Sequence, residues 1–420
     1  MTSTTKAAPL PVLARMLIAG AGIMSLANSV TIPFLAVFLR TDVGLQPALI
    51  GFIIGSSVFF SILAGFVGGS LSDVLGRARL LLISLCGVIG SLVGLYLSDS
   101  ATTVFAFNAT LALSSGVFAP VGKALLGDLL PRERRAKTFS YQYVATNIGY
   151  AVGPVAGAAV GLAGDRRAFL AGAVGYGIYL IGLSVVLLRE PAARATAAGD
   201  GPRQRVGSVL RGLADSARIV RVDRRLLFLI IAGLLLEAVH GRISSLLAQH
   251  LSVGFADGVT ILGYVLATNA VTVVALQVSV SRFTTKRNPV TSITVGGLLT
   301  VAGMVGFALA DGLWQFVAAM VVFSLGEVLI YPAEFAIIDR IAPEDNRGAY
   351  FGAQTFAQLG VFIGPFTGGL LLGAYGATAM FLGVGSFALA SVVIYLIAGR
   401  RTGLAARVPD RRSSGSNAED

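Results

Sequence analysis

The sequence predicts an all-α polytopic membrane protein with twelve transmembrane helices, and three observations carry this prediction. Of the 420 residues, 55% are apolar and only 13% are charged, whereas a soluble domain has about 25% charged residues. The mean hydropathy is +0.81. The apolar residues come in blocks of about 20, the length at which a helix spans a bilayer. Together these features exclude a disordered chain and argue against a water-soluble enzyme.

The spans are expected to be helices, because a backbone exposed to lipid must satisfy its own hydrogen bonds. Short stretches that are basic or contain Gly and Pro separate one span from the next. The predicted spans are 13–38, 48–70, 79–97, 101–127, 138–163, 168–188, 226–251, 259–280, 290–309, 313–340, 349–374 and 378–398.

Lysine and arginine are distributed unevenly between the two sides of this topology. With the amino terminus inside, 27 of the 32 fall on cytoplasmic segments, and only Arg40, Arg166 and Arg167 fall outside. Cytoplasmic loops of membrane proteins carry such an excess, so we expect a multi-pass protein of the cell membrane with both termini in the cytoplasm. The net charge of +11 follows from this bias and favours contact with anionic lipid. No basic face with interleaved aromatic residues indicates a nucleic-acid partner.

One long connection divides the chain into two related halves. We expect an N-terminal six-helix bundle over 1–189, an Arg-rich cytoplasmic linker over 190–225, a C-terminal six-helix bundle over 226–400 and a cytoplasmic tail over 401–420. The pairs that recur at a constant offset are Asp128 and Asp339, Gly149 and Gly360, Gly153 and Gly364, Pro154 and Pro365, and Gly157 and Gly368. Transporters built from such repeats place the substrate near the bilayer midplane, between the halves.

Residues that would support catalysis, a metal or a phosphate loop are scarce. The single cysteine, Cys86, cannot form an internal disulfide and is expected to be a small buried apolar residue. The two histidines, His240 and His250, lack the spacing of a paired metal site. The nearest phosphate-loop lookalike, from Gly116 to Lys123, has one intervening residue too many and lies inside a span. We therefore expect no enzyme activity, no cofactor, no metal and no ATP-driven step.

The loop after the second span carries the most specific motif. It reads Gly69-Ser70-Leu71-Ser72-Asp73-Val74-Leu75-Gly76-Arg77-Ala78-Arg79 and resembles the signature loop of the major facilitator superfamily, G-x-L-x-D-x-x-G-R-x-[RK]. The resemblance covers essentially the whole chain, and in this family the loop latches the cytoplasmic side when the cavity opens outward. It implies a cytoplasmic gate of Gly69, Asp73, Gly76, Arg77, Arg79, Asp128 and Arg135, with Asp128 as the partner of Arg77. A purely topological basic loop is the alternative.

The fifth span carries glycine at every fourth position. Gly149, Gly153 and Gly157 clear one stripe of the helix for close packing, and Pro154 bends it. The stretch resembles the span-5 motif G-x-x-x-G-P-x-x-G of drug:proton antiporters in the same family. Generic small-residue packing is the alternative. The arginine that many of these exporters carry in span 4 is replaced by Ala112 here, which puts a standard span-4 proton relay in doubt.

Charged residues inside the spans are few, and they fall in spans that line the central cavity of this family. Glu237 and Arg242 lie in span 7, and Glu327 and Glu334 lie in span 10. A carboxylate near the midplane is costly and therefore functional by default, and burial favours its protonated form. A group that binds either a proton or a cation can exchange one for the other. Glu327 ranks first, since Gly326 to Pro332 resembles span 10 of some multidrug:proton antiporters, and Glu237 ranks second.

Structural roles for these residues stay open. Glu327 has the alternative of pairing with Arg242 or a hydroxyl, and Glu237 has the alternative of an ion pair with Arg242. Glu334 is a candidate entry or relay site, and His240, on the same helix face as Glu237, either titrates or stays neutral. The candidate polar contacts of the cavity are Asn28, Tyr143, Asn147, Asn269 and Tyr331.

The sequence therefore predicts a secondary active transporter that exports drugs or other amphipathic small molecules in exchange for protons. We expect a monomer whose partners are an amphipathic or cationic substrate, protons and membrane lipid. Two transport alternatives stay open: a specific exporter of a metabolite or lipid, and a proton-coupled importer of a sugar or peptide. A sensor or scaffold with a transporter-like fold is the alternative outside transport.

Overall fold

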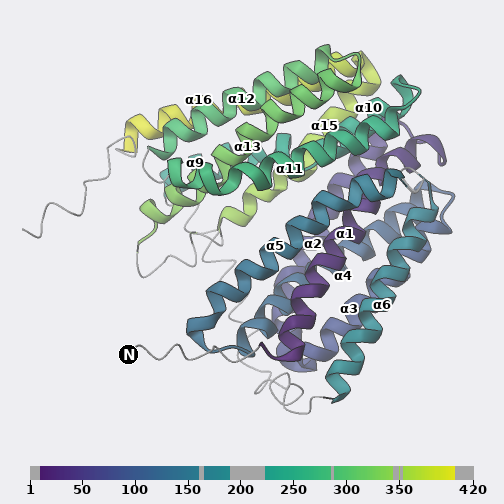
Figure 1. The fold of residues 1–420 in the computed structure, drawn as a ribbon. Coiled ribbons are helices and arrows are strands. Elements are labelled where there is room, and N and C mark those ends of the chain that lie inside the picture. The colour runs from purple at the N-terminus through teal and green to yellow at the C-terminus, as the bar shows by residue number, and fades with distance from the viewer. Residues whose placement is uncertain are drawn as a thin grey trace, which may run out of the picture.

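The structure is a computed structural model that describes residues 10–159, 165–189, 223–284, 288–343, 350 and 353–402, and the regular elements in these ranges are helical (Figure 1). The first half of the chain forms α1 (Val12–Thr41), α2 (Pro47–Leu75), α3 (Arg77–Tyr96), α4 (Ala101–Asp128), α5 (Arg132–Ala159) and α6 (Arg167–Arg189). The second half forms α9 (Arg224–His240), α10 (Ile243–Gly254), α11 (Gly258–Thr284), α12 (Pro289–Leu309), α13 (Leu313–Ile341), the 3-10 helix η2 (Thr355–Leu359), α15 (Gly360–Tyr375) and α16 (Ala377–Thr402).

The predicted all-α, membrane-spanning fold class is confirmed. Eleven helical stretches in the described ranges are long and apolar enough to cross a membrane, and α5 is a further helix of 28 residues. Most of the predicted linker, residues 190–222, and the predicted tail lie outside the described residues. The bounds of the four predicted segments therefore stay a prediction.

Span 7 differs from the prediction, because it is not one continuous helix. α9 ends at His240, α10 begins at Ile243, and Arg242 between them has φ −148° and ψ 36°. No proline lies near the break, and Gly241 is its only local signal in the sequence. Span 11 also begins irregularly, since η2 precedes α15. Both irregular points border the space between the two halves.

The glycine pattern shared by the two halves corresponds to the same kind of helix contact in each. In the first half, an added Cβ on Gly149 would lie 2.8 Å from the backbone nitrogen of Leu26 in α1. In the second half, an added Cβ on Gly360 would lie 2.7 Å from the backbone nitrogen of Ala238 in α9. α5 therefore packs on α1, and α15 packs on α9, at distances that only glycine allows.

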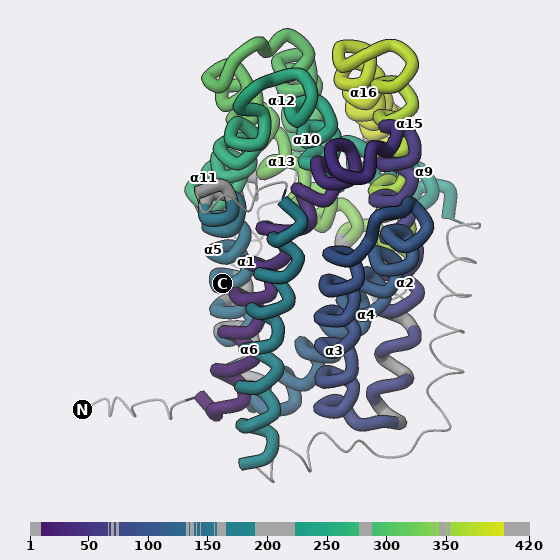
Figure 2. Tube along the Cα trace, turned by 90° about the vertical axis from the view of Figure 1, so that its right-hand side faces the viewer, coloured from purple at the N-terminus to yellow at the C-terminus, as the bar shows by residue number. Residues whose placement is uncertain are grey.

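The helices of the two halves meet at one end of the molecule and diverge toward the other (Figures 1 and 2). The diverging end, called the basic end below, holds Arg77, Arg79, Asp128, Arg189 and Arg224. The end where the halves meet, called the opposite end, holds Asp42, Asp99, Asp165 and Arg166. The Lys and Arg distribution of the sequence predicts that the basic end faces the cytoplasm.

The opposite end is closed by contact between α2 and α15. An added Cβ on Gly55 would lie 2.9 Å from the carbonyl oxygen of Phe362, and one on Gly51 would lie 2.7 Å from the carbonyl carbon of Pro365. The rings of Phe59 and Phe362 pack with their centroids 5.1 Å apart. α10 packs on α1 beside this contact. We call the contact between α2 and α15 the seam.

Loops at the opposite end of the first half are held by one arginine. Arg166 pairs with Asp99 at 3.1 Å and with Asp42 at 3.6 Å, and its guanidinium lies 5.5 Å from the ring centroid of Phe38. The hydrogen bond that Arg166 donates to Asp99, with the charge of both aspartates, holds the pKa of Arg166 above its usual range. The arginine therefore stays charged and joins the ends of α1 and α3 to the start of α6.

Candidate functional site

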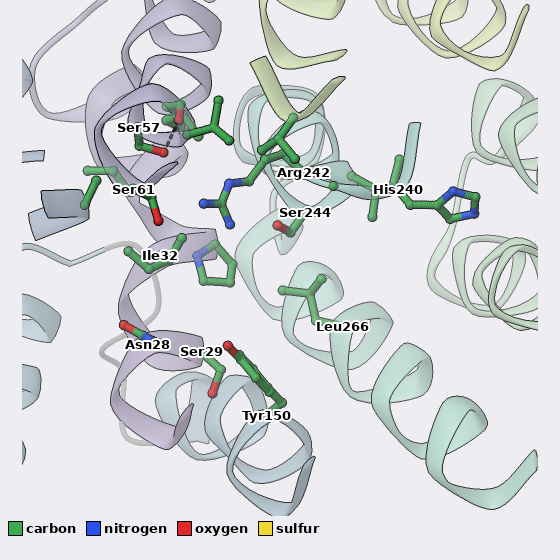
Figure 3. Close-up of a pocket in the computed structure, with 18 of the residues that line it drawn as sticks. Asn28, Ser29, Ile32, Ser57, Ser61, Tyr150, His240, Arg242, Ser244 and Leu266 are labelled. Carbon is green, nitrogen blue, oxygen red and sulfur yellow. Dashed lines mark hydrogen bonds between the residues drawn. The ribbon is translucent and has the colours of Figure 1, made fainter. Parts of the chain in front are cut away.

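A cavity of about 610 Å³ lies between the two halves of the molecule. Helices α1, α2, α4 and α5 supply one wall, and α9, α10, α11 and α13 supply most of the other (Figure 3). A second cavity, of about 1030 Å³, adjoins it, since both are lined by Asn28, Ser61, Ser115, Tyr150 and Gln358. The second cavity reaches Lys123, near the basic end of α4. The central space is therefore approached from the basic end.

The first-half wall of the central cavity is polar, and its described residues include no charged side chain. Its polar residues are Asn28, Ser29, Ser57, Ser61, Asn108, Ser115 and Tyr150. Two of its serines donate to carbonyls of their own helices, Ser57 to Ile54 at 2.7 Å and Ser29 to Leu26 at 3.0 Å. Sequence reasoning selected only Asn28 from this wall, because a serine that bonds its own helix gives no signal of its direction.

Asn28 and Asn108 are held in place by neighbouring helices. The hydroxyl of Tyr176 in α6 donates a 3.0 Å hydrogen bond to Oδ1 of Asn28. Asn108 of α4 donates a 2.9 Å hydrogen bond to the carbonyl of Ile53 in α2. Each amide therefore bonds a neighbouring helix and also lines the cavity.

The second-half wall supplies the charge. Glu237 and Arg242 both line the cavity, and Figure 3 shows Arg242 extending toward α1 and α2. The hydroxyl of Tyr331 donates a hydrogen bond to the Glu237 carboxylate. Glu237 and Arg242 interact electrostatically, but within the described chain Arg242 forms no ion pair, and its Nε is buried without a hydrogen-bond partner. The ion pair considered as an alternative for Glu237 is not formed.

Glu327 lies directly behind the cavity wall. Asn269 of α11, which lines the cavity, donates hydrogen bonds of 2.9 Å to Oε2 of Glu327 and to Oγ of Ser324. Glu237 and Glu327 interact electrostatically with each other, and each of them also interacts electrostatically with Tyr331. We call Glu237 and Glu327 the acidic pair. The structure thus brings four predicted site residues, the acidic pair with Asn269 and Tyr331, into one group.

Glu334 does not line the central cavity, although it interacts electrostatically with Glu237 and Tyr331. Its side chain is 6% exposed and accepts a 2.7 Å hydrogen bond from the hydroxyl of Tyr395 in α16. It borders a narrow space between α9, α13, η2 and α16, and not the central cavity. Glu327 and Glu334 lie seven residues apart on the continuous helix α13, yet Glu327 bonds Asn269 of α11 and Glu334 bonds Tyr395 of α16.

His240 borders the cavity but turns its ring away from Arg242 (Figure 3). Its Nδ1 lies 3.1 Å from the carbonyl oxygen of Leu236, and its Nε2 lies 3.1 Å from Oγ1 of Thr300 in α12. The ring packs on Phe323 with centroids 4.9 Å apart. Both ring nitrogens thus have partners inside the second half.

The span-5 glycines pack α5 against α1, as the small-residue alternative predicts. Gly149 and Gly153 contact α1 closely, and an added Cβ on Gly157 would lie 3.3 Å from Val30. Oγ of Ser29 donates a 3.1 Å hydrogen bond to the carbonyl of Gly149. Pro154, however, lines the central cavity, so the motif belongs both to the packing and to the site.

The loop between α2 and α3 lies at the basic end. Arg77 forms an ion pair with Asp128, which joins the start of α3 to the end of α4. Gly76 has φ +83°, a left-handed conformation that favours glycine, and Arg79 is exposed. The surroundings of Gly69, Asp73, Arg135 and Tyr143 lie outside what the structure describes. Asn147 is half-buried on α5, and the cavity lining does not include it.

One polar row was not predicted from the sequence. Ser245, Gln249 and Ser252 follow Arg242 at helical spacing along α10, toward the opposite end. Their side-chain polar atoms are buried and have no hydrogen-bond partner among the described residues. The spacing of three, four and three residues between these polar side chains is the pattern in the sequence from which the row could have been predicted.

Comparisons with known proteins agree with this architecture. The sequence profile of the Major Facilitator Superfamily matches residues 17–358 and 244–418. The MFS-type transporter YqjV of Bacillus subtilis is 30% identical over 84% of either chain. The Na(+), Li(+), K(+)/H(+) antiporter of Planococcus maritimus is 27% identical over 87% of this chain and 90% of its own. The quinolone resistance protein NorA of Staphylococcus aureus is 24% identical over 89% of this chain and 92% of its own.

The fold also matches a solved transporter structure. The nucleoside transporter NupG superposes with a TM-score of 0.78 at 12% identity, over 92% of this chain and 99% of that one. A likeness at this identity shows the shared fold and nothing of the substrate. Together with the profile match over most of the sequence, it leaves one conclusion: the chain is a multi-pass membrane transporter and belongs to the Major Facilitator Superfamily.

Proposed function

We propose that the protein exports drugs or other amphipathic small molecules in exchange for protons. The observation that carries the proposal is the acidic pair, two carboxylates at the central cavity whose hydrogen-bond partners are neutral. Asn269 donates to Glu327, and Tyr331 donates to Glu237. In the described part of the chain neither carboxylate forms an ion pair with a cation.

Neutral partners matter because proton exchange needs both forms of the carboxyl group. An arginine partner would hold a carboxylate in its charged form. An amide or a phenol has both donor and acceptor atoms, so it can bond either the carboxylate or the carboxylic acid. The acidic pair can therefore keep a hydrogen-bond partner both when it holds a proton and when it has released it.

The cavity supports alternating access. It adjoins the space that leads to the basic end, and the seam closes it at the opposite end. In the exchange cycle, Glu327 holds the proton in one orientation of the transporter and releases it when substrate enters. Glu237, which lines the cavity, is the group nearest to the substrate.

Two relatives add support through their names. One is a Na(+), Li(+), K(+)/H(+) antiporter, which names exchange against protons, and the other is a quinolone resistance protein. At 24–27% identity neither name transfers to this chain by itself. A monovalent cation is the second candidate substrate, and it is tested in the same assay.

The test is transport by purified protein in proteoliposomes with an imposed pH gradient and a lipophilic cationic rhodamine dye. We expect the dye to move against the proton flow. Glu327→Gln keeps the shape and the hydrogen bond from Asn269 but cannot carry a proton, so gradient-driven movement is expected to be lost. Asp311→Asn makes the same chemical change at an exposed site of the opposite end and should transport at the wild-type rate.

The outcomes separate the candidates. Dye movement along the proton flow would indicate import and overturn the proposal. Stimulation of proton release by Na⁺, Li⁺ or K⁺, with no movement of dye, would favour the cation exchanger. Normal exchange by Glu327→Gln would remove Glu327 from the coupling step, and the same measurement on Glu237→Gln would then decide whether the acidic pair is involved at all.

A further inference from the structure

Arg242 is a cation inside the central cavity that lacks an ion-pair partner. It occupies the break between α9 and α10, lines the cavity and extends toward the polar wall of α1 and α2 (Figure 3). Within the described chain no carboxylate forms an ion pair with it, and its Nε is buried with no hydrogen-bond partner. A buried charge left unpaired is costly, so this arginine is placed to receive an anion from outside the protein.

The start of α10 reinforces the positive charge. The first N–H groups of a helix have no partner within the helix, and the helix dipole adds partial positive charge there. Ile243 and Ser244, the first two residues of α10, line the same cavity as Arg242. Arg242 makes no side-chain capping bond to this helix start. The same cavity is therefore bordered by the Arg242 guanidinium, by the start of α10 and by Ser244.

The facing wall suits an uncharged remainder of the ligand. It presents hydroxyl and amide groups of Ser57, Ser61 and Asn28, next to aliphatic Ile32. Among the described residues, the lining includes no acidic side chain of the first half, and its one acid is Glu237, in the same wall as Arg242.

We propose that Arg242 and the first turn of α10 form an anion-binding subsite, and that the substrates of the central cavity are amphipathic compounds that carry a carboxylate. Arginine binds a carboxylate through two parallel hydrogen bonds. The acidic pair, in the same half, remains available to a cationic group of a zwitterionic substrate. The inference takes from the proposed function only that this cavity is the substrate site.

The test is equilibrium binding, measured by fluorescence anisotropy on purified protein in lipid nanodiscs without any gradient. The two probes are a rhodamine with a free pendant carboxylate and the ethyl ester of the same dye, which differ only in the anionic group. We expect the acid to bind about tenfold more tightly than the ester. Arg242→Gln should weaken the acid about tenfold and leave the ester unchanged, and Arg242→Lys should retain part of the preference.

A second variant covers the case in which Arg242→Gln fails to fold. Ser244→Asp places a carboxylate in the first turn of α10, where the helix dipole favours it, and this carboxylate occupies the subsite in place of the ligand. It should lower the affinity for the acid probe and spare the ester. Arg167→Gln removes an exposed charge at the opposite end and should alter neither affinity.

Two results would overturn the inference. The first is equal binding of acid and ester by the wild-type protein. The second is an equal loss of both probes in Arg242→Gln together with an unchanged preference in Ser244→Asp. Because no proton gradient is applied, a failure of proton-coupled exchange leaves this result standing, and a failure of the binding preference leaves the proton exchange of the proposed function standing.

Discussion

The side-chain amide of Asn269 bonds Glu327 and Ser324 at the same time, each at 2.9 Å. It joins α11 to α13 beside the central cavity and stands between the cavity and the Glu327 carboxylate. In the proposed exchange of protons, Asn269 therefore controls the access of Glu327 to the cavity.

The first prediction concerns this amide. Asn269→Leu removes a hydrogen bond to a carboxylate, which is worth roughly 1.5–3 kcal/mol, and replaces it with an apolar contact. We expect gradient-driven dye exchange to fall about tenfold or more. Thr268→Val changes the preceding residue, whose hydroxyl bonds its own helix at Tyr264, and should leave exchange intact. Wild-type exchange by Asn269→Leu would remove the amide from the coupling step.

A second prediction separates Glu334 from the acidic pair. Tyr395→Phe removes the 2.7 Å hydrogen bond to Glu334 and leaves a buried carboxyl group without it, at a cost of about 1–3 kcal/mol. We expect a lower unfolding temperature and unchanged coupling in the folded fraction. Tyr375→Phe alters a side chain that is 77% exposed and should match the wild type. A coupling defect at normal stability would instead place Glu334 in the proton path.

The third prediction tests the close contact of α5 with α1. Gly153→Leu would force a side chain into the carbonyl oxygen of Leu26, 2.9 Å from an added Cβ, and into Ser29. We expect a large loss of monodisperse protein in detergent. Gly175→Leu adds the same side chain to α6, where an added Cβ meets no atom within 4 Å, and should be tolerated. Equal yields for the two variants would contradict the contact.

The fourth prediction concerns the seam. Gly51→Leu places a side chain where an added Cβ lies 2.7 Å from the carbonyl carbon of Pro365, so the opposite end should fail to close. The reporter is Ser57→Cys on the cavity wall, in a Cys86→Ser background, labelled with a membrane-impermeant maleimide. We expect Gly51→Leu to raise labelling from the opposite end severalfold.

The control for this experiment is Gly90→Leu in α3, where an added Cβ meets open space. It should label as the parent does, mainly from the basic end. If Gly51→Leu labels only from the basic end, the contact between α2 and α15 does not hold the opposite end closed.

A fifth prediction uses the polar row of α10. Gln249 is 2% exposed, and neither its Nε2 nor its Oε1 has a hydrogen-bond partner among the described residues. Each unsatisfied buried polar group costs about 1–3 kcal/mol. Gln249→Leu should therefore stabilise the state that is closed at the opposite end, which raises the unfolding temperature and slows dye exchange. A lower unfolding temperature would mean that Gln249 has a partner in this state.

The fold could be predicted from the sequence because its two signals are one-dimensional. Hydropathy marks each span, and the glycine and proline pattern that recurs in the second half marks the two related bundles. Charged residues inside the spans also indicate part of the site, since Glu237 and Arg242 both line the cavity.

The direction of each side chain was harder to predict. A helix that is apolar on its lipid side and on its bundle side has no stripe that marks the inward face. The bond between Glu327 and Asn269 and the bond between Glu334 and Tyr395 both depend on how α13 is rotated about its axis relative to its neighbours. The break before Arg242 likewise depends on packing, because its only local signal is Gly241.

The seam has a consequence for leakage and turnover. Backbone atoms dominate its closest approaches, where Gly51 faces Pro365 and Gly369 faces Pro47. Surfaces of this kind separate without freeing interlocked side chains, so parting them requires few rotamer changes. The neighbouring phenylalanines, such as Phe59 against Phe362, add side chains to the same contact. We expect the backbone contacts to determine how readily the seam opens, and these side chains to determine how tightly it seals.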